Sequence, residues 1–472
     1  MRPTHIHGAL HPCRAARAEA DANHSFHAIY RAPNAALIIK EDSAMTYSII
    51  DFGAAAGGET LCTAAIQAAI DACAAAGGGR VVVPAGLYRT GTIFLRSHVE
   101  LHLQHGARLK ASTNLDDYNA DDAYPQNSGC ANEGWNAKHL ILAIECEDVA
   151  LTGTGTIDGS GETFFADEVK PLRFGMYAWR KGFLRERDTV NLRPGQMICF
   201  IECRGVTVRD LTLTASPCWC CFFHGCDDVQ ARGLRIFNPP YAANTDGLDI
   251  DTCRRVTVSD CIIDTGDDAI AIRGSARRLK DKNRCCEHIV ITNCVLSSAS
   301  SVFRIGVGTF PIRHVRVSNI TIPYGGIGVN FCVEWGGVAG TPVEDVHFDG
   351  VSAGEVGLMT EVYVAHGTPV RHVTLSHFSG NVLSAVKLLC KTPGAVSDFA
   401  LSDMDFKLHH DTLSCGDDFA ETRGSSYMRC EGVERLRLTD CRVEAEPDVI
   451  AEWPDPVRID ENARLENCSF PQ

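Results

Sequence analysis

The chain has 472 residues, a formal net charge of −15 at pH 7 and 45% apolar residues. The negative charge argues against nucleic acid or an anionic membrane as the main partner, and no apolar run is long enough to span a membrane. We therefore expect a soluble globular protein with a large core. An anionic sugar stays open as a substrate, because a few local arginines or lysines can match its charge.

Residues 1–44 differ from the rest of the chain. They are rich in His, Arg and Ala and contain no apolar segment of the kind that a secretory signal needs. We expect a disordered extension or a start codon assigned too early, because Met45 directly precedes the first strand-like segment. A transit peptide is the alternative, although Glu19 and Asp21 make the segment less basic. A single domain is then expected over residues 45–472.

One helix is expected near the beginning of this domain. The segment Thr60–Ala76 is rich in alanine, has apolar residues at helical spacing and is followed by three glycines, which act as a stop signal. After residue 80, short runs of alternating apolar residues predominate and helical periodicity is nearly absent. The rest of the domain is therefore expected to be all-β, with the helix covering its open end.

A short unit recurs through the β region: a cysteine, two apolar residues two positions apart, and then Asp or Asn. Successive copies lie roughly 23 to 37 residues apart, the spacing of solenoid coils. A short strand cannot bury its apolar face alone, so successive coils must stack on one another to form a β-solenoid. The first apolar residues of the copies are Val206, Val256, Ile289, Val315, Val346, Val373 and Leu436.

The sequence contains 22 cysteines, and many of them hold a constant position in the repeat. Stacked coils would align these cysteines as small buried thiols. We expect them to be reduced and the protein to be cytoplasmic, since so long a chain without a secretory signal does not resemble a disulfide scaffold. One set is Cys146, Cys203, Cys226, Cys253, Cys286 and Cys430, and a second set is Cys261, Cys294 and Cys441.

The densest acidic cluster falls within two adjacent coils. Asp246 lies in the segment Asn244–Gly247, and Asp267 and Asp268 follow about one coil later. Stacking would bring these acids within roughly 5 Å of one another. Crowding raises the pKa of at least one carboxyl group, so that one acid can hold a proton while another activates water, as glycosidic cleavage requires. From spacing alone, a turn-forming role is equally consistent.

Five segments carry a family resemblance: Tyr47–Gly53, Gly77–Gly86, Gly153–Gly159, Asn244–Gly247 and Gly266–Ile272. They resemble glycoside hydrolase family 28, the polygalacturonase family of the pectin lyase-like superfamily. The resemblance implies a single-stranded right-handed parallel β-helix, an inverting catalytic domain and no cofactor or metal. It also implies that Asp267 protonates the leaving oxygen, that Asp246 and Asp268 hold and activate water, and that Asn244 positions the site.

Two positions depart from the family pattern. The family usually has Gly-His-Gly after a cysteine that corresponds to Cys294, but Ser301 stands where that histidine would align. The family's Arg-Ile-Lys motif, which binds a galacturonate carboxylate, corresponds here to a stretch that contains Asn330. Hydrolysis by three aspartates is compatible with both changes, but the usual recognition of galacturonate is not. We expect a pectin-like or other plant-derived oligosaccharide or polysaccharide as the substrate.

Several nearby residues are candidates for binding this substrate. Arg273 follows the second acidic segment and Arg304 lies on the next coil, so each could bind a substrate carboxylate. For both arginines the alternative is an ion pair with the acidic cluster. Trp219 could stack on a sugar ring and His224 lies close to it in the sequence, but packing in the core is the alternative for both.

Two other functions fit the same sequence. A polysaccharide lyase would hold Ca²⁺ with acidic residues and remove a proton with a basic residue. A non-catalytic carbohydrate-binding solenoid would have lost its activity together with the His and Arg-Ile-Lys motifs. The acids available to hold Ca²⁺ are Asp246, Asp249, Asp251, Asp267 and Asp268.

Overall fold

The computed structural model describes residues 45–120, 123–126, 137–165, 193–410 and 424–472. The expected extension over residues 1–44 lies outside the described residues. The chain from Ala44 to Gln472 clusters as one compact unit, and this unit is the subject of all that follows. None of the helices in the described ranges is long and apolar enough to cross a membrane.

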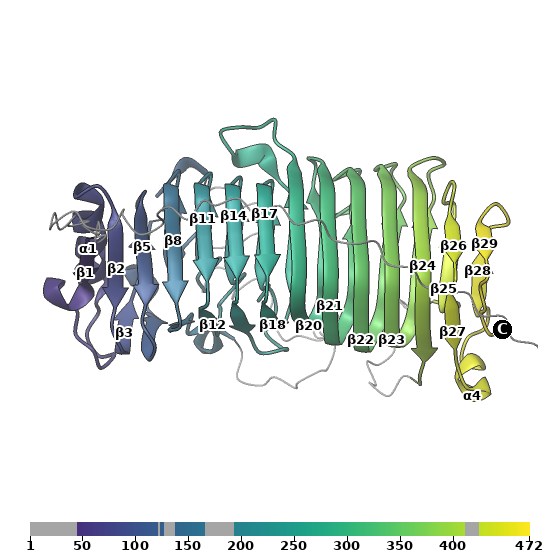
Figure 1. Cartoon of the computed structure of the whole chain (residues 1–472), viewed down its shortest axis with the longest axis horizontal. Helices are drawn as coiled ribbons and strands as arrows, with labels where there is room; N and C mark the ends of the chain where they lie inside the picture. Colours follow the sequence, from purple (N-terminus) through teal and green to yellow (C-terminus); the bar gives the residue numbers. More distant parts are fainter. Residues whose placement is uncertain (1–44, 121–122, 127–136, 166–192, 411–423) are drawn as a thin grey trace, which may run out of the picture. The chain divides into compact units, whose positions relative to one another are not determined.

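The strands of the described residues pair in parallel and fall into three rows, so that three short strands make one coil. Figure 1 shows the strands of the first row side by side along the solenoid. This is the expected right-handed parallel β-helix. The first row contains β1 (Thr46–Ser48), β2 (Gly79–Val83), β5 (Val99–Leu103), β8 (Glu147–Gly153), β11 (Arg204–Arg209), β14 (Asp227–Arg232) and β17 (Arg254–Ser259). The second row contains β3 (Gly86–Thr90), β6 (Ala107–Ala111), β9 (Thr156–Asp158), β12 (Thr212–Thr214), β15 (Arg235–Phe237) and β18 (Ile262–Thr265). The third row contains β4 (Ile93–Phe94), β7 (Ile141–Ile144), β10 (Ile198–Ile201), β13 (Cys221–His224), β16 (Leu248–Asp251) and β19 (Ile270–Gly274).

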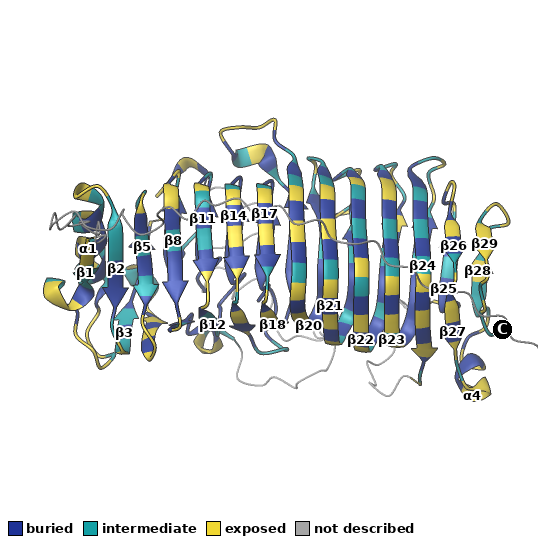
Figure 2. Ribbon diagram, in the orientation of Figure 1, coloured by how far each residue is buried: buried dark blue, intermediate teal, exposed yellow. Residues whose placement is uncertain are grey.

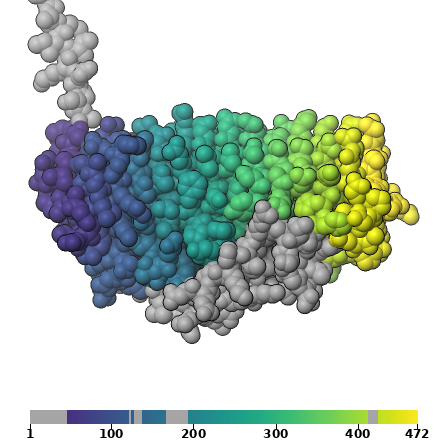
Figure 3. Space-filling model, turned by 90° about the horizontal axis from the view of Figure 1, so that it is seen from below, coloured from purple at the N-terminus to yellow at the C-terminus, as the bar shows by residue number. Residues whose placement is uncertain are grey.

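Later coils are built from longer strands that continue through the corners between rows. Successive coils follow one another in sequence order along the domain (Figure 3). The long strands are β20 (Cys286–Gly308), β21 (Ile312–Cys332), β22 (Val343–Val364), β23 (Val370–Cys390) and β24 (Val396–Leu408). The last coils contain β25 (Met428–Glu431), β26 (Arg437–Thr439), β27 (Arg442–Glu444), β28 (Val457–Ile459) and β29 (Arg464–Glu466). The helical elements are α1 (Thr63–Ala75), α4 (Pro447–Ile450) and the 3-10 turns η1 (Ile49–Phe52), η2 (Leu115–Asp117), η4 (Gly161–Phe164) and η6 (Ala276–Arg278).

The repeated apolar residues stack in register inside the solenoid. Val206 aligns with Val149 on one side and with Val229 on the other, and all three are buried. Buried and exposed residues alternate along the first part of the long strands, as the bands in Figure 2 show. The repeat in the sequence therefore corresponds to one coil, and β8, β14 and β24 carry less regular copies of it.

The first set of cysteines forms a ladder in the core, with one exception. The register aligns Cys146, Cys203, Cys226, Cys253 and Cys286 on five consecutive coils, and all five are buried thiols. The prediction was wrong for Cys430, which lies on β25 in the third row and pairs with Leu388. Val433 holds the ladder position in that coil, because Leu436, which directly precedes β26, lies three residues after Val433 and six after Cys430.

The expected helix is confirmed as α1. Its residues Ile66, Ala69, Ile70 and Cys73 are buried against the first coil, where α1 contacts β1 and β2. Figure 1 shows α1 beside these strands at the beginning of the solenoid. The helix thus covers apolar residues that no preceding coil buries in the described part of the chain.

Aromatic residues fill the core of the later coils, and this generates a test of the stacking. The ring of Phe348 contacts Phe303 and Phe378 in edge-to-face geometry and is fully buried. We expect Phe348→Ala to lower the free energy of unfolding by about 3–5 kcal/mol, because it leaves a cavity between two coils. Urea denaturation followed by circular dichroism measures this effect. Phe237→Ala is the control, since Phe237 is 42% exposed, and an equal loss in both variants would contradict the stacked core.

Candidate active site

The three predicted acids lie at the entrance to the third strand row, on two adjacent coils. Asp246 precedes β16 by two residues, and Asp268 precedes β19 by two residues. The Gly247 amide donates to the Asp268 carbonyl oxygen (2.8 Å), so Asp246 and Asp268 occupy equivalent positions in their coils. One carboxylate oxygen each from Asp246, Asp267 and Asp268 lies within 4.8 Å of the others. The structure therefore brings the three acids together, as the coil spacing predicts.

Glycines next to the acids allow these turns to pack. A Cβ atom at Gly247 would lie 2.5 Å from the Ala269 carbonyl oxygen on the next coil. A Cβ atom at Gly266 would overlap the Ala242 carbonyl oxygen on the preceding coil. Both contacts are with backbone, which cannot move aside without breaking the coil. The glycines of the two acidic segments are therefore required for the close approach that gathers the carboxylates.

Burial and mutual repulsion perturb the titration of this cluster. The exposed fractions of Asp246, Asp267 and Asp268 are 3%, 3% and 1%. Burial, and then the charges of Asp267, Asp249 and Asp268, raise the pKa of Asp246 well above its ordinary value. Burial raises the pKa of Asp268 to about 6, although Arg304 acts in the opposite direction. The cluster therefore binds a proton more readily than three isolated carboxylates would.

Asp267 is surrounded by hydrogen-bond donors. Its Oδ2 accepts from the backbone amide of Asn244 (3.1 Å) and from the side-chain amide of the same residue (3.4 Å). Its Oδ1 accepts from the backbone amide of Asp268 (3.1 Å). Arg193, which is buried, donates to the Asn244 side-chain oxygen (3.0 Å) and so orients the amide toward Asp267. Sequence reasoning missed Arg193, because it lies far from the acidic segments along the chain.

Arg304 lies against the acids themselves. Its Nε is 2.5 Å from Oδ2 of Asp268 and its terminal nitrogen is 3.8 Å from Oδ1 of Asp267. Its side chain is 12% exposed. This is the ion pair that was the alternative to substrate binding for this residue. Arg304 still reaches the surface beside the acids, so its contact with a substrate stays a prediction.

Ser301 and Asn330 lie on the same side of the cluster. The register of β19 on β20 places Ser301 beside Asp268, on the next coil. Ser301 is fully buried, and its hydroxyl accepts a hydrogen bond from the Asn330 side-chain amide (3.2 Å). Asn330 aligns with Arg304 in the register of β20 and β21. Asn330 is partly exposed whereas Ser301 is buried, so of these two predicted substrate-binding residues only Asn330 can be reached from solvent.

The other predicted binding residues form a packed wall. The Arg273 guanidinium lies 4.3 Å from the centre of the Trp219 ring, and its Nε is 3.6 Å from Asp251. His224 stacks on Phe222 at 5.1 Å between ring centres, and its Nε2 is 3.0 Å from the Ser275 carbonyl oxygen. Trp219, His224 and Arg273 are each 5% exposed. These three side chains are packed against other protein groups, and direct contact with a substrate stays a prediction for all three.

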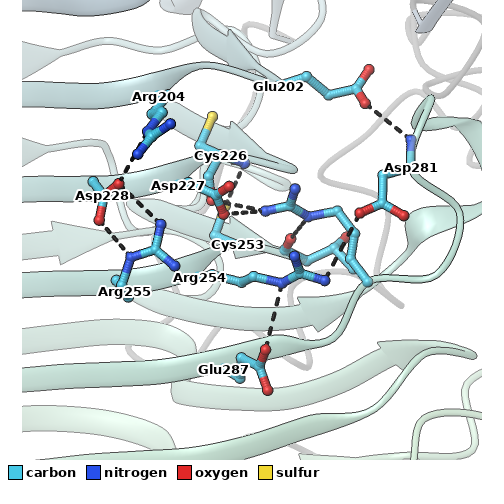
Figure 4. Close-up of polar contacts among 12 residues, drawn as sticks. Glu202, Arg204, Cys226, Asp227, Asp228, Cys253, Arg254, Arg255, Asp281 and Glu287 are labelled. Carbon is cyan, nitrogen blue, oxygen red and sulfur yellow. Dashed lines mark hydrogen bonds and ion pairs between the residues drawn. The ribbon is translucent and has the colours of Figure 1, made fainter.

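An arginine–carboxylate network secures the segment between β19 and β20, next to this wall. Arg284 pairs with Asp227 (2.5 Å) and donates through Nε to a backbone carbonyl of the neighbouring coil (2.9 Å). Glu202 accepts from the Asp281 amide (3.4 Å), and Figure 4 shows this contact together with the arginine pairs around Asp227. Carboxylates of earlier coils thus hold the segment in place, and with it Ser275.

The acidic residues do not fit a Ca²⁺ site of the kind a lyase would need. The spacing of Asp246, Asp267 and Asp268 could hold a cation. However, Arg304 is already paired with two of these acids, and Asp251 is paired with Arg273. Ca²⁺ prefers six to eight oxygen ligands, and a fixed guanidinium beside the cluster would repel it. The arginine supplies the positive charge that a metal would otherwise supply.

Comparison with known proteins assigns the family. The sequence profile described as "Glycosyl hydrolases family 28" matches residues 73–420. A "Probable polygalacturonase" of Vitis vinifera is 29% identical over 231 residues, which cover 48% of this chain and 44% of that protein. An "Exo-poly-alpha-D-galacturonosidase" of Dickeya chrysanthemi is 29% identical over 255 residues, covering 47% of this chain and 41% of that protein. The chain thus matches less than half the length of these relatives. It belongs to glycoside hydrolase family 28.

Solved structures show the same fold. An exopolygalacturonase from Thermotoga maritima superposes with a TM-score of 0.56 at 21% identity, over 90% of this chain and 93% of that one. An endo-xylogalacturonan hydrolase from Aspergillus tubingensis superposes with a TM-score of 0.58 at 16% identity, over 89% of this chain and 100% of that one. At these identities the likeness concerns the β-helix fold.

The raised pKa of Asp246 predicts the pH dependence of stability. A carboxyl group with a raised folded-state pKa destabilises the folded protein increasingly as the pH rises above the ordinary, unfolded-state pKa, and the full cost is present above the folded-state pKa; the cost disappears as the pH falls below the unfolded-state value. We therefore expect Asp246→Asn to unfold at a higher urea concentration than the wild type at about pH 8, with the difference shrinking toward about pH 4.

Asp349→Asn is the matched control for this experiment. Hydrogen bonds from Ser376 and His377 lower the pKa of Asp349, so its charge stabilises the folded protein above the ordinary carboxyl pKa. The control should therefore lose stability at neutral pH and match the wild type at acidic pH. A pH-independent gain for Asp246→Asn would contradict the assigned electrostatics.

Proposed function

We propose that this protein is a glycoside hydrolase that cleaves glycosidic bonds of a pectin-like oligosaccharide or polysaccharide. The observation that carries the proposal is the cluster of Asp246, Asp267 and Asp268, whose carboxylates lie within 4.8 Å of one another. Glycosidic hydrolysis needs a proton for the leaving oxygen and a base for the attacking water. A crowded carboxylate cluster with raised pKa values supplies both groups in one place.

Asp267 is assigned as the acid and Asp246 and Asp268 as the pair that holds the water. The proton of the free protein rests on Asp246, whose pKa burial raises well above the ordinary value. A carboxylate oxygen of Asp267 lies within 4.8 Å of one of Asp246, close enough for Asp267 to receive this proton before it passes to the leaving oxygen. Asn244 positions Asp267 through its two amide donors. Arg304 holds Asp268 as a carboxylate, suited to accept a proton from water.

Pectin-like substrates are proposed because of what the relatives act on. The matched proteins of Vitis vinifera and Dickeya chrysanthemi are described as acting on polygalacturonan. The structural neighbour from Aspergillus tubingensis acts on xylogalacturonan. Galacturonan-based glycans, with or without neutral sugars, are therefore the proposed class of substrate.

A cytoplasmic location is a further part of the proposal. The ladder from Cys146 to Cys286 places reduced thiols on five consecutive coils, and the Cys226 amide lies 3.3 Å from the Cys253 sulfur. Thiols of this kind persist in reducing compartments. The enzyme would then act on imported oligosaccharides.

Substitution of the acids tests the reaction and assigns their roles. On a panel of pectic oligosaccharides, Asp267→Asn should lower kcat by about 10²–10⁴-fold, because the leaving oxygen is no longer protonated. The same variant should keep most of its activity on a glycosyl fluoride, whose leaving group needs no proton, whereas Asp268→Asn should lose activity on both substrates. If Asp246→Asn, rather than Asp267→Asn, still hydrolyses the glycosyl fluoride, the role of general acid belongs to Asp246. Unchanged turnover in all three variants would contradict the proposal.

The stereochemical outcome is a separate test. Carboxylates of inverting glycosidases are commonly about 6.5–9.5 Å apart, so this tighter cluster would by that rule suggest retention. We nevertheless expect inversion, because Asp246 and Asp268 occupy equivalent positions on adjacent coils and can hold a single water between them. Proton NMR of the first product should show the anomer opposite to that of the cleaved bond. The retained anomer would indicate a covalent intermediate and would contradict the water-holding roles.

A further inference from the structure

A strip of polar side chains continues from the acid cluster toward the later coils. The register aligns Arg304 with Asn330, Asn330 with Glu361, and Glu361 with Lys387, one residue per coil. The residues on either side of each are buried, so these four side chains point outward. Coils are spaced by about 4.8 Å, and the strip therefore lies alongside any sugar that extends from the acids in this direction.

The charges on this strip are already matched within the protein. Lys387 lies 3.1 Å from Glu361, and their side chains are 22% and 20% exposed. Arg304 is paired with Asp268 and Asp267. A uronate carboxylate that approached Lys387 would also approach the Glu361 carboxylate and would have to displace it. The strip therefore favours hydroxyl groups over carboxylates, because a Lys–Glu pair can donate to one hydroxyl and accept from another.

An exposed tryptophan stands over the beginning of the strip. Trp335 is 51% exposed, and its ring centre lies 5.5 Å from the Arg304 guanidinium carbon. The preceding residue, Glu334, accepts hydrogen bonds from the backbone amides of Ala365 (2.7 Å) and Thr368 (3.0 Å) on the next coil. The turn that carries the indole is thus anchored, and a rigid apolar ring faces solvent beside the catalytic cluster. Indole faces of this kind stack on the C–H faces of sugars.

We propose that Trp335, Asn330, Glu361 and Lys387 form a subsite for a neutral sugar residue. Trp335 stacks on the ring, Asn330 and the Lys387–Glu361 pair bind its hydroxyls, and the Glu361 carboxylate repels a uronate. The substrate is then a pectin-like chain in which a sugar beside the cleaved bond carries no charge. This inference rests on the proposed hydrolase function and specifies its substrate.

Substrates that differ only in charge test the subsite. Two substrates place an uncharged sugar at the subsite: methyl-esterified galacturonan oligomers and oligomers that alternate galacturonate with rhamnose. We expect the wild-type kcat/KM on each of them to be at least about tenfold higher than on free-acid galacturonan oligomers of equal length. A tenfold ratio corresponds to about 1.4 kcal/mol. Glu361→Gln should reduce this preference about tenfold, because it removes the carboxylate that repels a uronate at this position. Glu344→Gln, an exposed change at the other end of β22, is the matched control and should keep the wild-type preference.

Trp335 is tested by its effect on binding. Trp335→Ala should raise KM for the neutral-sugar substrates about tenfold with a smaller change in kcat, and Trp335→Phe should restore part of the loss. A wild-type preference for the free-acid oligomers, or a preference unchanged in Glu361→Gln, would overturn the neutral subsite while leaving hydrolysis intact.

Binding separates the two proposals if no oligosaccharide is cleaved. Calorimetric titration of the same oligomers into wild type and Glu361→Gln then reads the subsite directly. Tighter binding of the uncharged oligomers that Glu361→Gln reduces would support the subsite without the hydrolase. Equal binding of charged and uncharged oligomers would overturn it.

Discussion

The axial stacking of coils is the constraint on which the rest of this molecule depends. Every strand in the described rows pairs in parallel with the coil before or after it, so residues one coil apart in sequence must lie about one strand spacing apart in space. The same rule aligns the ladder from Cys146 to Cys286 in the core and Asp246 beside Asp268 at the surface. The stacking of one coil on the next thus aligns both core residues and site residues, and the two kinds of position differ only in whether the side chain points into the core or outward.

This geometry makes the acid cluster unfavourable for folding unless it is compensated. Three carboxylates that stacking forces together repel one another, and burial adds a desolvation cost to each. The compensation is local: Arg304 pairs with Asp268, and the amides of Asn244 and Asp268 donate to Asp267. Asp246 and Asp268 each keep one buried oxygen without a hydrogen-bond partner, and burial raises the pKa of both. The cost of the site is therefore carried by these two carboxyl groups.

Sequence reasoning succeeded where function follows from coil spacing and failed where it does not. The solenoid, the helix α1 and the gathering of Asp246, Asp267 and Asp268 all follow from a regular repeat. The place of Cys430 was misjudged because the cysteine lies three residues before the true ladder position of its coil, which Val433 occupies. Arg193 was missed because it belongs to no copy of the repeat and lies 51 residues before Asn244, to which it donates a hydrogen bond. Glu361, Lys387 and Trp335 were missed because their relation to Arg304 depends on the register of the long strands, which shifts within β20 and within β22.

The presence of an arginine, and of serine where the family pattern has histidine, has a consequence of its own. Ser301 occupies the position where the family pattern has histidine, and the nearby cation here is Arg304 instead. Histidine titrates near neutral pH, so its charge would come and go in the working range, whereas a guanidinium stays charged at every accessible pH. The field that Asp268 experiences from Arg304 is therefore constant. Among the described residues of the cluster, it is the carboxyl groups of Asp246 and Asp268 whose pKa values burial raises, so the pH response of the cluster is expected to come from these acids rather than from Arg304.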